Sequence, residues 1–285
     1  FVAVQERFAA LAGRHARAAL AARQRWLTML GTLGGKWPHT HSVQPGGSSR
    51  AIDSSERIRL LARVREFRTF LEETLFGAPL EEVTALASLA QLDAWQARAP
   101  QRGDLRLFLG IAADLGLATL GAGPGRYLSH GAFADATGRL ALAQGVFDGA
   151  SGAVQPVPFD AVSEDTTFAW LAGEANDARH PFRGQTVPLP DKEGAYTWNK
   201  APRLAGRVVE TGALARQLVQ GNPLLRECVA RRGSGVLARV LARLYELALI
   251  TPWLEDWLAD IRPGEPFHRP APLPRFGQAA GLAEA

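Results

Sequence analysis

Apolar side chains recur every three or four positions near both ends of the chain, which is the spacing of one face of an α-helix. Five stretches share this pattern and are predicted to be helical or to start a helix: 3–31, 53–76, 80–95, 209–216 and 236–261. In the last stretch, Thr251-Pro252 is expected either to kink the helix or to cap a new one, because proline lacks an amide hydrogen. The pattern therefore predicts that helices dominate both ends of the chain.

The helix predicted over residues 53–76 has local signals at both of its ends. Asp53 and Glu56 have the spacing of a capping box, in which each side chain accepts a hydrogen bond from the other residue's amide. Gly77 is the expected stop. One apolar stripe is predicted along this helix: Ile58, Leu61, Val64, Phe67, Phe70, Leu71 and Leu75.

The middle of the chain is richer in glycine and proline, and its apolar runs are short. Three runs separated by turn-forming residues predict strands at 127–133, 140–147 and 153–159. Residues 100–104 are expected to form a linker, and residues 263–277, with five prolines, an extended surface chain. The fold class expected is α+β and mostly α, with a helical-bundle core and an irregular β-containing middle region.

Three parts are distinguished along the chain and are expected to form one integrated domain. They are the N-terminal helices (1–104), the irregular β/loop region (105–203), and the C-terminal helices with a proline-rich tail (204–285). The first residue is Phe1, not Met, and residues 281–285 stop without a helix-ending signal. Both ends of the chain are therefore expected to be cut.

Composition indicates a soluble globular protein, because 47% of the 285 residues are hydrophobic. The net charge of +4 comes from arginines spread along helices, so no nucleic-acid partner is expected. The single cysteine, Cys228, excludes a disulfide framework and indicates a reducing, cytoplasmic compartment. No transmembrane segment is predicted, since the most apolar stretch, 105–120, carries Arg106 and Asp114.

Residues 33–47 form the most distinctive stretch: Leu-Gly-Gly-Lys-Trp-Pro-His-Thr-His-Ser-Val-Gln-Pro-Gly-Gly. Two glycine pairs bracket a tryptophan, two prolines and two histidines, which suits neither a helix nor a strand. A fixed loop between two helices is predicted, and such loops often carry sites. His39 and His41 lie two positions apart, which gives no ready chelate, so hydrogen bonding within the loop is favoured over metal binding.

A few charged residues are candidates for chemistry, each with a plainer alternative. Glu164 and Asp165 suit a general-base pair, but also a helix start or a solvated loop. Lys200 and Arg203 are expected either to bind an anion or to hold a carboxylate such as Glu210. The remaining histidines stand apart from one another in the sequence: His15, His130, His180 and His268.

Two glycine-rich segments are expected to be plain turns. Gly121-Ala-Gly-Pro-Gly125 lacks a following Lys-Ser/Thr, and Pro124 removes an amide donor, so a phosphate loop is not favoured. Gly233-Ser-Gly235 lacks the context of a nucleophile elbow. Spacing alone therefore assigns no activity to the chain.

Five motifs follow one another along the chain: Gly34-Gly-Lys-Trp-Pro-His39 with Pro45-Gly-Gly47, Ser163-Glu-Asp near Trp170, His180-Pro-Phe-x-Gly-x-Thr186, Thr197-Trp-Asn-Lys-Ala-Pro-Arg203, and Glu210-Thr-Gly-Ala-Leu-Ala-Arg216. Together they resemble the large subunit of nickel-iron hydrogenases. The similarity covers nearly the whole chain, including residues 281–285, which resemble the lead-in to that family's Arg-Gly segment. It implies a hydrogenase-large-subunit-like fold.

The resemblance also implies a cofactor and a partner. In that family, a nickel-iron centre with cyanide and carbon monoxide on the iron hangs from two Cys-x-x-Cys pairs, and neither pair occurs in this sequence. The ligands of an Fe(CN)2CO unit or a NiFe centre would therefore lie outside residues 1–285, leaving no catalytic residue and no metal ligand within them. Cys228 is expected to be a buried structural thiol. His39 matches a histidine that faces the small subunit's proximal iron–sulfur cluster, where it would donate or accept hydrogen bonds instead of binding metal.

The sequence differs from the family's catalytic members at several motif positions, and these differences bear on whether the chain is a catalytic subunit or an accessory protein. Those members usually have His-Pro-His-Pro-Gln in the loop and Glu-Val-Gly-Pro-Leu-Ala-Arg at the helix start, where this chain has Trp37, Thr40-His41, Thr211 and Ala213. The changes favour accessory paralogues, the hydrogenase expression/formation proteins, which are thought to act as scaffolds for building the Fe(CN)2CO unit together with hydrogenase maturation proteins.

Two alternatives to the scaffold remain open, so whether the chain is an enzyme is not decided. One is the catalytic large subunit of an uptake hydrogenase, which oxidises hydrogen with an iron–sulfur small subunit, in that case at the periplasmic face of the membrane. The other is a helical interaction protein unrelated to hydrogenases. Cys-x-x-Cys pairs on either side of the present sequence would favour the catalytic reading over the scaffold.

Overall fold

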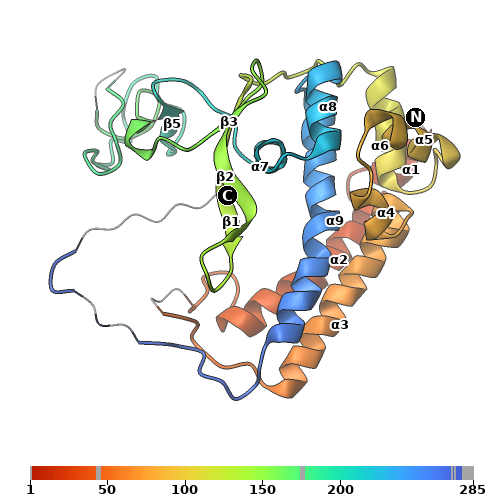
Figure 1. Ribbon diagram of the computed structural model, residues 1–285, viewed down its shortest axis with the longest axis horizontal. Helices are drawn as coiled ribbons and strands as arrows, with labels where there is room; N and C mark the ends of the chain where they lie inside the picture. Colours follow the sequence, from red (N-terminus) through yellow and green to blue (C-terminus); the bar gives the residue numbers. More distant parts are fainter. Residues whose placement is uncertain (1, 43–45, 174–176, 271, 273, 278–285) are drawn as a thin grey trace. The chain divides into compact units, whose positions relative to one another are not determined.

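A computed structural model describes residues 2–42, 46–173, 177–270, 272 and 274–277 (Figure 1). The described residues fall into two units. The first comprises residues 2–86, 90–114 and 244–277, and the second comprises residues 87–89 and 115–243. The predicted boundaries near residues 104 and 203, and the integration of all parts into one domain, stay predictions.

The first unit is helical. Its elements are α1 (Val2–Phe8), α2 (Arg14–Gly34), α3 (Ser54–Phe70), the π-helix η1 (Leu71–Phe76), α4 (Leu80–Thr84), most of α5 (Leu89–Arg98), α6 (Asp104–Asp114) and the C-terminal part of α9 (Val236–Asp260). Met29 of α2, Leu60 and Val64 of α3, and Leu258 of α9 form one buried cluster. Three helices that are distant in sequence therefore share a core.

The helix predicted over residues 3–31 is wrong in its length, because the chain breaks into α1 and α2. Leu11 has a positive φ of 62°, and the amide of Gly13 donates a hydrogen bond of 2.7 Å to the carbonyl of Ala9. A Cβ atom on Gly13 would lie 2.3 Å from the carbonyl oxygen of Arg7. This close approach requires glycine and ends the first helix.

Two further helices differ from the sequence prediction. The stretch 80–95 is divided into α4 and α5, and α6 is a helix where an irregular region was expected. Arg106 in α6, whose charge argued against a membrane-spanning segment, is 4% exposed. The linker predicted at 100–104 is confirmed up to Asp104, where α6 begins.

The signals predicted at the ends of α3 are confirmed. The carboxylate of Asp53 accepts from the amide of Glu56 at 2.7 Å, and the Glu56 carboxylate accepts from the Asp53 amide at 3.2 Å. Gly77, with φ of 62°, ends the π-helix that continues α3. The predicted apolar stripe is wrong at Ile58, which is 64% exposed, because Leu60 occupies the core position one turn before Val64.

The second unit contains the β structure. Strand β1 (Arg126–Ala134) pairs antiparallel with β2 (Leu140–Asp148), and β2 with the short β3 (Val154–Gln155). A separate sheet joins β4 (Val162–Asp165) to β5 (Ala201–Leu204), after the 3-10 turn η2 (Phe159–Ala161). The strands predicted at 127–133 and 140–147 are confirmed. The strand predicted at 153–159 is wrong beyond Gln155, since a turn follows it.

Helices complete the second unit. The helix start predicted at 209–216 is confirmed by α7 (Ala213–Gln220), which packs against β1 and β2 and is followed by α8 (Pro223–Arg232) and the beginning of α9. Helix α9 continues through Pro252, and the hydroxyl of Thr251 donates to the carbonyl of Leu247 at 2.6 Å. Residues 263–277, where described, contain no helix or strand. The α+β fold class with helices at both ends is confirmed.

Candidate functional site

The Gly-Gly-Lys-Trp-Pro-His loop of the first unit folds back on the end of α2. The amide of His41 and the hydroxyl of Thr40 both donate to the carbonyl of Gly34, at 2.9 and 2.8 Å. The hydroxyl of Ser42 donates to the carbonyl of Leu33 at 3.2 Å. The last carbonyls of a helix have no partner within it, so the loop caps α2 and is itself held in place.

The side chains of this loop face outward. Trp37 is 52% exposed, and His39 and His41 are also exposed. His39 has a φ of 59°, a left-handed conformation that is uncommon for residues other than glycine. The hydrogen bonds of its neighbours hold this conformation, so the backbone is fixed while the imidazole remains accessible. Within the described residues, His39 and His41 belong to no group that could hold a metal ion.

The second glycine pair of the same stretch pairs with the proline-rich tail, and Pro45 lies outside the described residues. The amide of Ser48 donates to the carbonyl of Phe267 at 3.0 Å, and the amide of Arg269 donates to that of Gly46 at 2.9 Å. A Cβ atom on Gly46 would lie 2.4 Å from the Arg269 oxygen, and one on Gly47 2.2 Å from the Phe267 oxygen. Only glycines allow this approach, because any side chain would meet backbone atoms.

In the second unit, β4 and β5 bring the predicted charged residues together in pairs. The ammonium of Lys200 lies 2.8 Å from the carboxylate of Glu164, and the guanidinium of Arg203 lies 3.6 Å from that of Asp165. Hydrogen bonds from Thr167, followed by the charge of Arg203, lower the pKa of Asp165. Glu164 and Asp165 are therefore strand residues and start no helix. Lys200 and Arg203 hold carboxylates, as one alternative predicted, but not that of Glu210.

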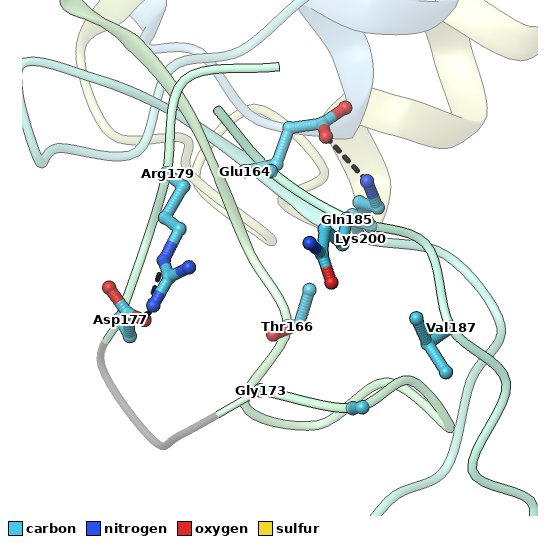
Figure 2. A pocket seen from close by; sticks show the side chains of 10 residues that line it. Glu164, Thr166, Gly173, Asp177, Arg179, Gln185, Val187 and Lys200 are labelled. Carbon is cyan, nitrogen blue, oxygen red and sulfur yellow. Dashed lines mark hydrogen bonds and ion pairs between the residues drawn. The ribbon is translucent and has the colours of Figure 1, made fainter. Parts of the chain in front are cut away.

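A cavity of about 160 Å³ lies beside this sheet. Figure 2 shows the Glu164–Lys200 pair on one side and the Asp177–Arg179 pair on another, with Gln185 between them. The guanidinium of Arg179 donates to Asp177 at 2.7 Å. Each cation already has an anionic neighbour, so the cavity is polar but close to neutral.

One lysine that spacing did not single out supports the wall of this cavity. The ammonium of Lys192 donates to the carbonyls of Thr166 at 2.8 Å and Leu171 at 3.0 Å. An ammonium has three donors, so Lys192 fixes two separate backbone segments at once. No local pattern marks such a role, because its acceptors are backbone carbonyls more than twenty positions away.

The carboxylate of Glu210 lies against the glycine-rich segment 121–125. It accepts hydrogen bonds from Arg239 at 2.6 and 2.9 Å, and these bonds raise the pKa of Arg239. A Cβ atom on Gly123 would lie 2.2 Å from a Glu210 oxygen, and the Gly123 amide donates to the hydroxyl of Ser234 at 3.2 Å. Burial raises the pKa of the neighbouring Tyr127. The space beside the glycines is thus filled by a carboxylate, which leaves no room for a phosphate.

The donors needed for a nickel-iron centre are not brought together in the described residues. Each remaining histidine has a different neighbour: His15 with the carboxylate of Asp104 at 2.6 Å, His130 with the ring of Phe159, His180 with the amide of Phe182, and His268 opposite Gly47. Cys228 is fully buried in α8. No three His, Cys, Asp or Glu side chains in the described part of the chain could hold a metal ion. Soft metals prefer several thiolates, so these residues do not fit such a centre.

No helix among the described residues combines the length and apolar character needed to span a bilayer.

Comparison with known proteins connects the fold to a family. The periplasmic NiFeSe hydrogenase large subunit of Desulfomicrobium baculatum is 28% identical over 141 residues, covering 44% of this chain and 27% of that protein. The quinone-reactive Ni/Fe-hydrogenase large chain of Wolinella succinogenes is 33% identical over 95 residues, 26% of this chain and 16% of that one.

Solved structures show the same fold. A reduced, active form of the Ni-Fe-Se hydrogenase from Desulfomicrobium baculatum superposes with a TM-score of 0.70 at 22% identity and covers 92% of this chain. The present chain spans 52% of that structure's length and 27% of the curated large subunit. The family model described as nickel-dependent hydrogenase matches residues 107–266, more than half of the sequence. The chain therefore belongs to the nickel-dependent hydrogenase family and has a large-subunit-like fold.

Proposed function

We propose that this chain holds a hydrogenase-large-subunit-like fold as a maturation scaffold, on which the Fe(CN)2CO unit is assembled. The supporting observation is the way in which the loop is closed. The hydroxyl of Thr40 donates to Gly34 and accepts from the amide of Ser42 at 3.1 Å. Catalytic members usually have proline at the position of Thr40, and proline has no hydroxyl with which to make these bonds. The loop of this chain is therefore closed by hydrogen bonds that a proline at position 40 could not make, and this difference from the catalytic members supports the scaffold proposal.

A scaffold of this kind would act through shape and contact. The exposed side chains of His39 and Trp37, carried on a backbone held by hydrogen bonds, would meet a maturation protein. Thiolates supplied from outside residues 1–285 would hold the iron unit, and no stable nickel would be present. Assembly of this unit would place the protein in the cytoplasm. The chain's own contribution would be to keep the loop, and its His39, in one conformation.

A second candidate is the catalytic large subunit of an uptake nickel-iron hydrogenase. The names of the relatives favour it, because both matched proteins above are hydrogenase large subunits or chains. In this case Cys-x-x-Cys pairs would flank the present sequence, and a small subunit with iron–sulfur clusters would face His39. The protein would then oxidise hydrogen at the periplasmic face of the membrane.

Metal analysis of the full-length protein distinguishes the two candidates. The protein is purified without oxygen from its own host, its nickel and iron are measured, and its infrared spectrum is recorded in the region of bound cyanide and carbon monoxide. A scaffold is expected to show iron with both diatomic ligands and no stoichiometric nickel. Equal amounts of nickel and iron, with hydrogen oxidation, would establish the catalytic large subunit instead. A protein with neither metal under conditions that mature the host's hydrogenase would contradict both.

A further inference from the structure

The positive charge of this chain is concentrated on two neighbouring helices. Helix α2 carries four arginines and no acidic residue, and α3 carries five arginines and two glutamates. The whole chain has a net charge of only +4, so the remainder is net acidic. The two helices pack side by side (Figure 1). They therefore form a basic surface within the first unit, although Arg68 of α3 is paired with carboxylates of Glu72, Glu81 and Glu255.

A groove of about 450 Å³ lies between these helices. Its lining includes two nearly buried apolar side chains, Met29 and Leu60, which are 5% and 2% exposed. Thr28 lines it from α2, and Arg59 and Arg63 line it from α3. We call this feature the α2–α3 groove. It combines an apolar floor with a cationic rim.

The rim has cationic charge that the described residues do not neutralise. Arg63 pairs with Glu66 at 2.8 Å, and Glu66 also pairs with Arg25 at 2.5 Å, so two guanidinium groups share one carboxylate. Glu56, the other glutamate of α3, is bound by Arg50 at 2.6 Å. Arg59 is exposed, and no hydrogen bond or ion pair holds its side chain in the described part of the chain, while its charge contributes to the lowered pKa of Asp53 at the start of the same helix. The groove is thus apolar inside and short of anions at its edge.

We propose that the α2–α3 groove docks an acidic amphipathic helix of a partner protein. Apolar side chains of that helix would fill the groove above Met29, Leu60 and the exposed Ala62, and its carboxylates, spaced one turn apart, would pair with Arg59 and Arg63. A helix laid in an apolar groove between two helices is a common mode of recognition. The charge complementarity selects an acidic helix over a neutral one. This inference depends on neither the scaffold role nor the catalytic role.

Two other anionic partners fit the groove less well. A phosphate backbone would pair with the arginines but would place nothing on the apolar floor, since nucleic acids bind basic surfaces mainly through phosphate contacts. A bilayer surface is flat and does not enter a groove between two helices. Among these partners, an amphipathic helix with apolar and acidic side chains can contact both the apolar floor and the cationic rim of the groove.

Fluorescence anisotropy tests the docking with a labelled helical peptide of about 20 residues, long enough to be helical by itself. The peptide has leucines on one face and glutamates beside them, and the comparison peptide has the same composition in scrambled order. We expect the full chain to bind the amphipathic peptide and not the scrambled one. Binding should weaken about tenfold between low and physiological salt, because salt screens the charge pairs. Equal binding of both peptides would overturn the proposal.

A matched pair of charge reversals locates the contact. Arg59→Glu and Arg65→Glu change the net charge equally on the same helix, but Arg65 projects from another side of α3 and does not line the groove. We expect Arg59→Glu to weaken peptide binding about tenfold and Arg65→Glu less than twofold. Ala62→Trp, which fills the groove without a change of charge, should also weaken binding. Circular dichroism verifies that each variant is folded.

Several outcomes would contradict the docking of a partner helix. Equal losses in the Arg59 and Arg65 variants would indicate a general charge effect. Stronger binding of phosphatidylserine vesicles or of a DNA duplex, with the same dependence on Arg59, would assign the groove to lipid or nucleic acid. Dimers in light scattering that Arg59→Glu dissociates would assign it to a second copy of the chain. Loss of binding in a longer form of the protein would show that its own chain covers the groove.

Discussion

Arg239 binds both carboxylate oxygens of Glu210, at 2.6 and 2.9 Å, although 29 positions separate the two residues. The pair lies where β1, the glycine-rich segment 121–125 and the start of α9 meet within the second unit. The Glu210 amide also donates to the carbonyl of Arg126 at 2.8 Å. A single residue thus joins a strand, a loop and a helix through its backbone and its side chain.

Removing Arg239 is expected to destabilise the second unit. Arg239→Met leaves the Glu210 carboxylate, whose side chain is 13% exposed, without its cation, which should cost about 2 kcal/mol of unfolding free energy. Arg243→Met, one turn later on an exposed position, should cost about 0.5 kcal/mol or less. Urea unfolding of both variants measures the difference, and equal values would show that the pair is not stabilising.

Arg106 is expected to tolerate no other cation. Its guanidinium stacks 3.5 Å from the ring centre of Trp95 and donates to the carbonyls of Trp95 and Phe76 at 3.1 and 2.8 Å. Burial lowers its pKa. Arg106→Lys keeps the charge but loses the planar guanidinium that stacks on Trp95 and donates to two carbonyls. We therefore expect the free energy of unfolding to fall by about 2 kcal/mol. Arg102→Lys, at an exposed position four residues earlier, is the control in the same unfolding assay and should be nearly neutral.

The hydrogen bonds that hold the Gly-Gly-Lys-Trp-Pro-His loop against the end of α2 are expected to depend on the hydroxyl of Thr40. Thr40→Val removes the bond to Gly34 and should cost about 1 kcal/mol, whereas Thr40→Ser should cost little. Hydrogen exchange at the His41 amide should become faster only in the valine variant, because that amide binds the same Gly34 carbonyl.

A double-mutant cycle tests the close contact in the same loop. A Cβ atom on Gly34 would lie 2.2 Å from the Thr40 hydroxyl oxygen. Gly34→Ala should therefore be less destabilising in a Thr40→Ala background than in the natural chain, with a coupling of about 1 kcal/mol. Strict additivity of the two substitutions would mean that this contact is absent in solution.

Stability of the first unit is expected to fall in acid through Glu56. The hydrogen bond from Arg50, followed by that from the Asp53 amide, lowers the pKa of Glu56 below its ordinary value of 4.5. The unfolded chain therefore takes up the proton first, and the stabilisation is complete above pH 4.5 and lost as the pH falls toward the lower folded value. Glu56→Gln should reduce the dependence of the unfolding free energy on pH over this range. Glu73→Gln, which removes an exposed carboxylate from η1, is the matched control.

Local signals explain which elements the sequence predicted well. Asp53, Glu56 and Gly77 act within a few positions of the helix ends that they set, so α3 and its continuation were found. The break at Gly13 was missed because its cause is a close contact with the Arg7 carbonyl, which exists only after folding. Helix α6 was missed because residues 105–114 were grouped with the glycine- and proline-rich region that follows them.

The candidate site was predicted in its residues but not in its pairings. Lys200 and Glu164 were both singled out, yet 36 positions separate them, and only the alignment of β4 with β5 makes them partners. The basic α2–α3 groove was also not foreseen, since each helix alone has an ordinary distribution of arginines. Chemistry that depends on two segments meeting requires the fold, because no local pattern encodes it.

The pairing of Gly46 and Gly47 with residues 267–269 uses backbone atoms on both sides. Mutational tolerance across it should consequently be unequal: almost any side chain is acceptable at Phe267 or Arg269 so long as the main chain keeps its path, whereas neither glycine can be exchanged. The two segments of this contact would thus evolve at different rates, and the side chains of the proline-rich tail would be free to change while its backbone stays attached at the same place.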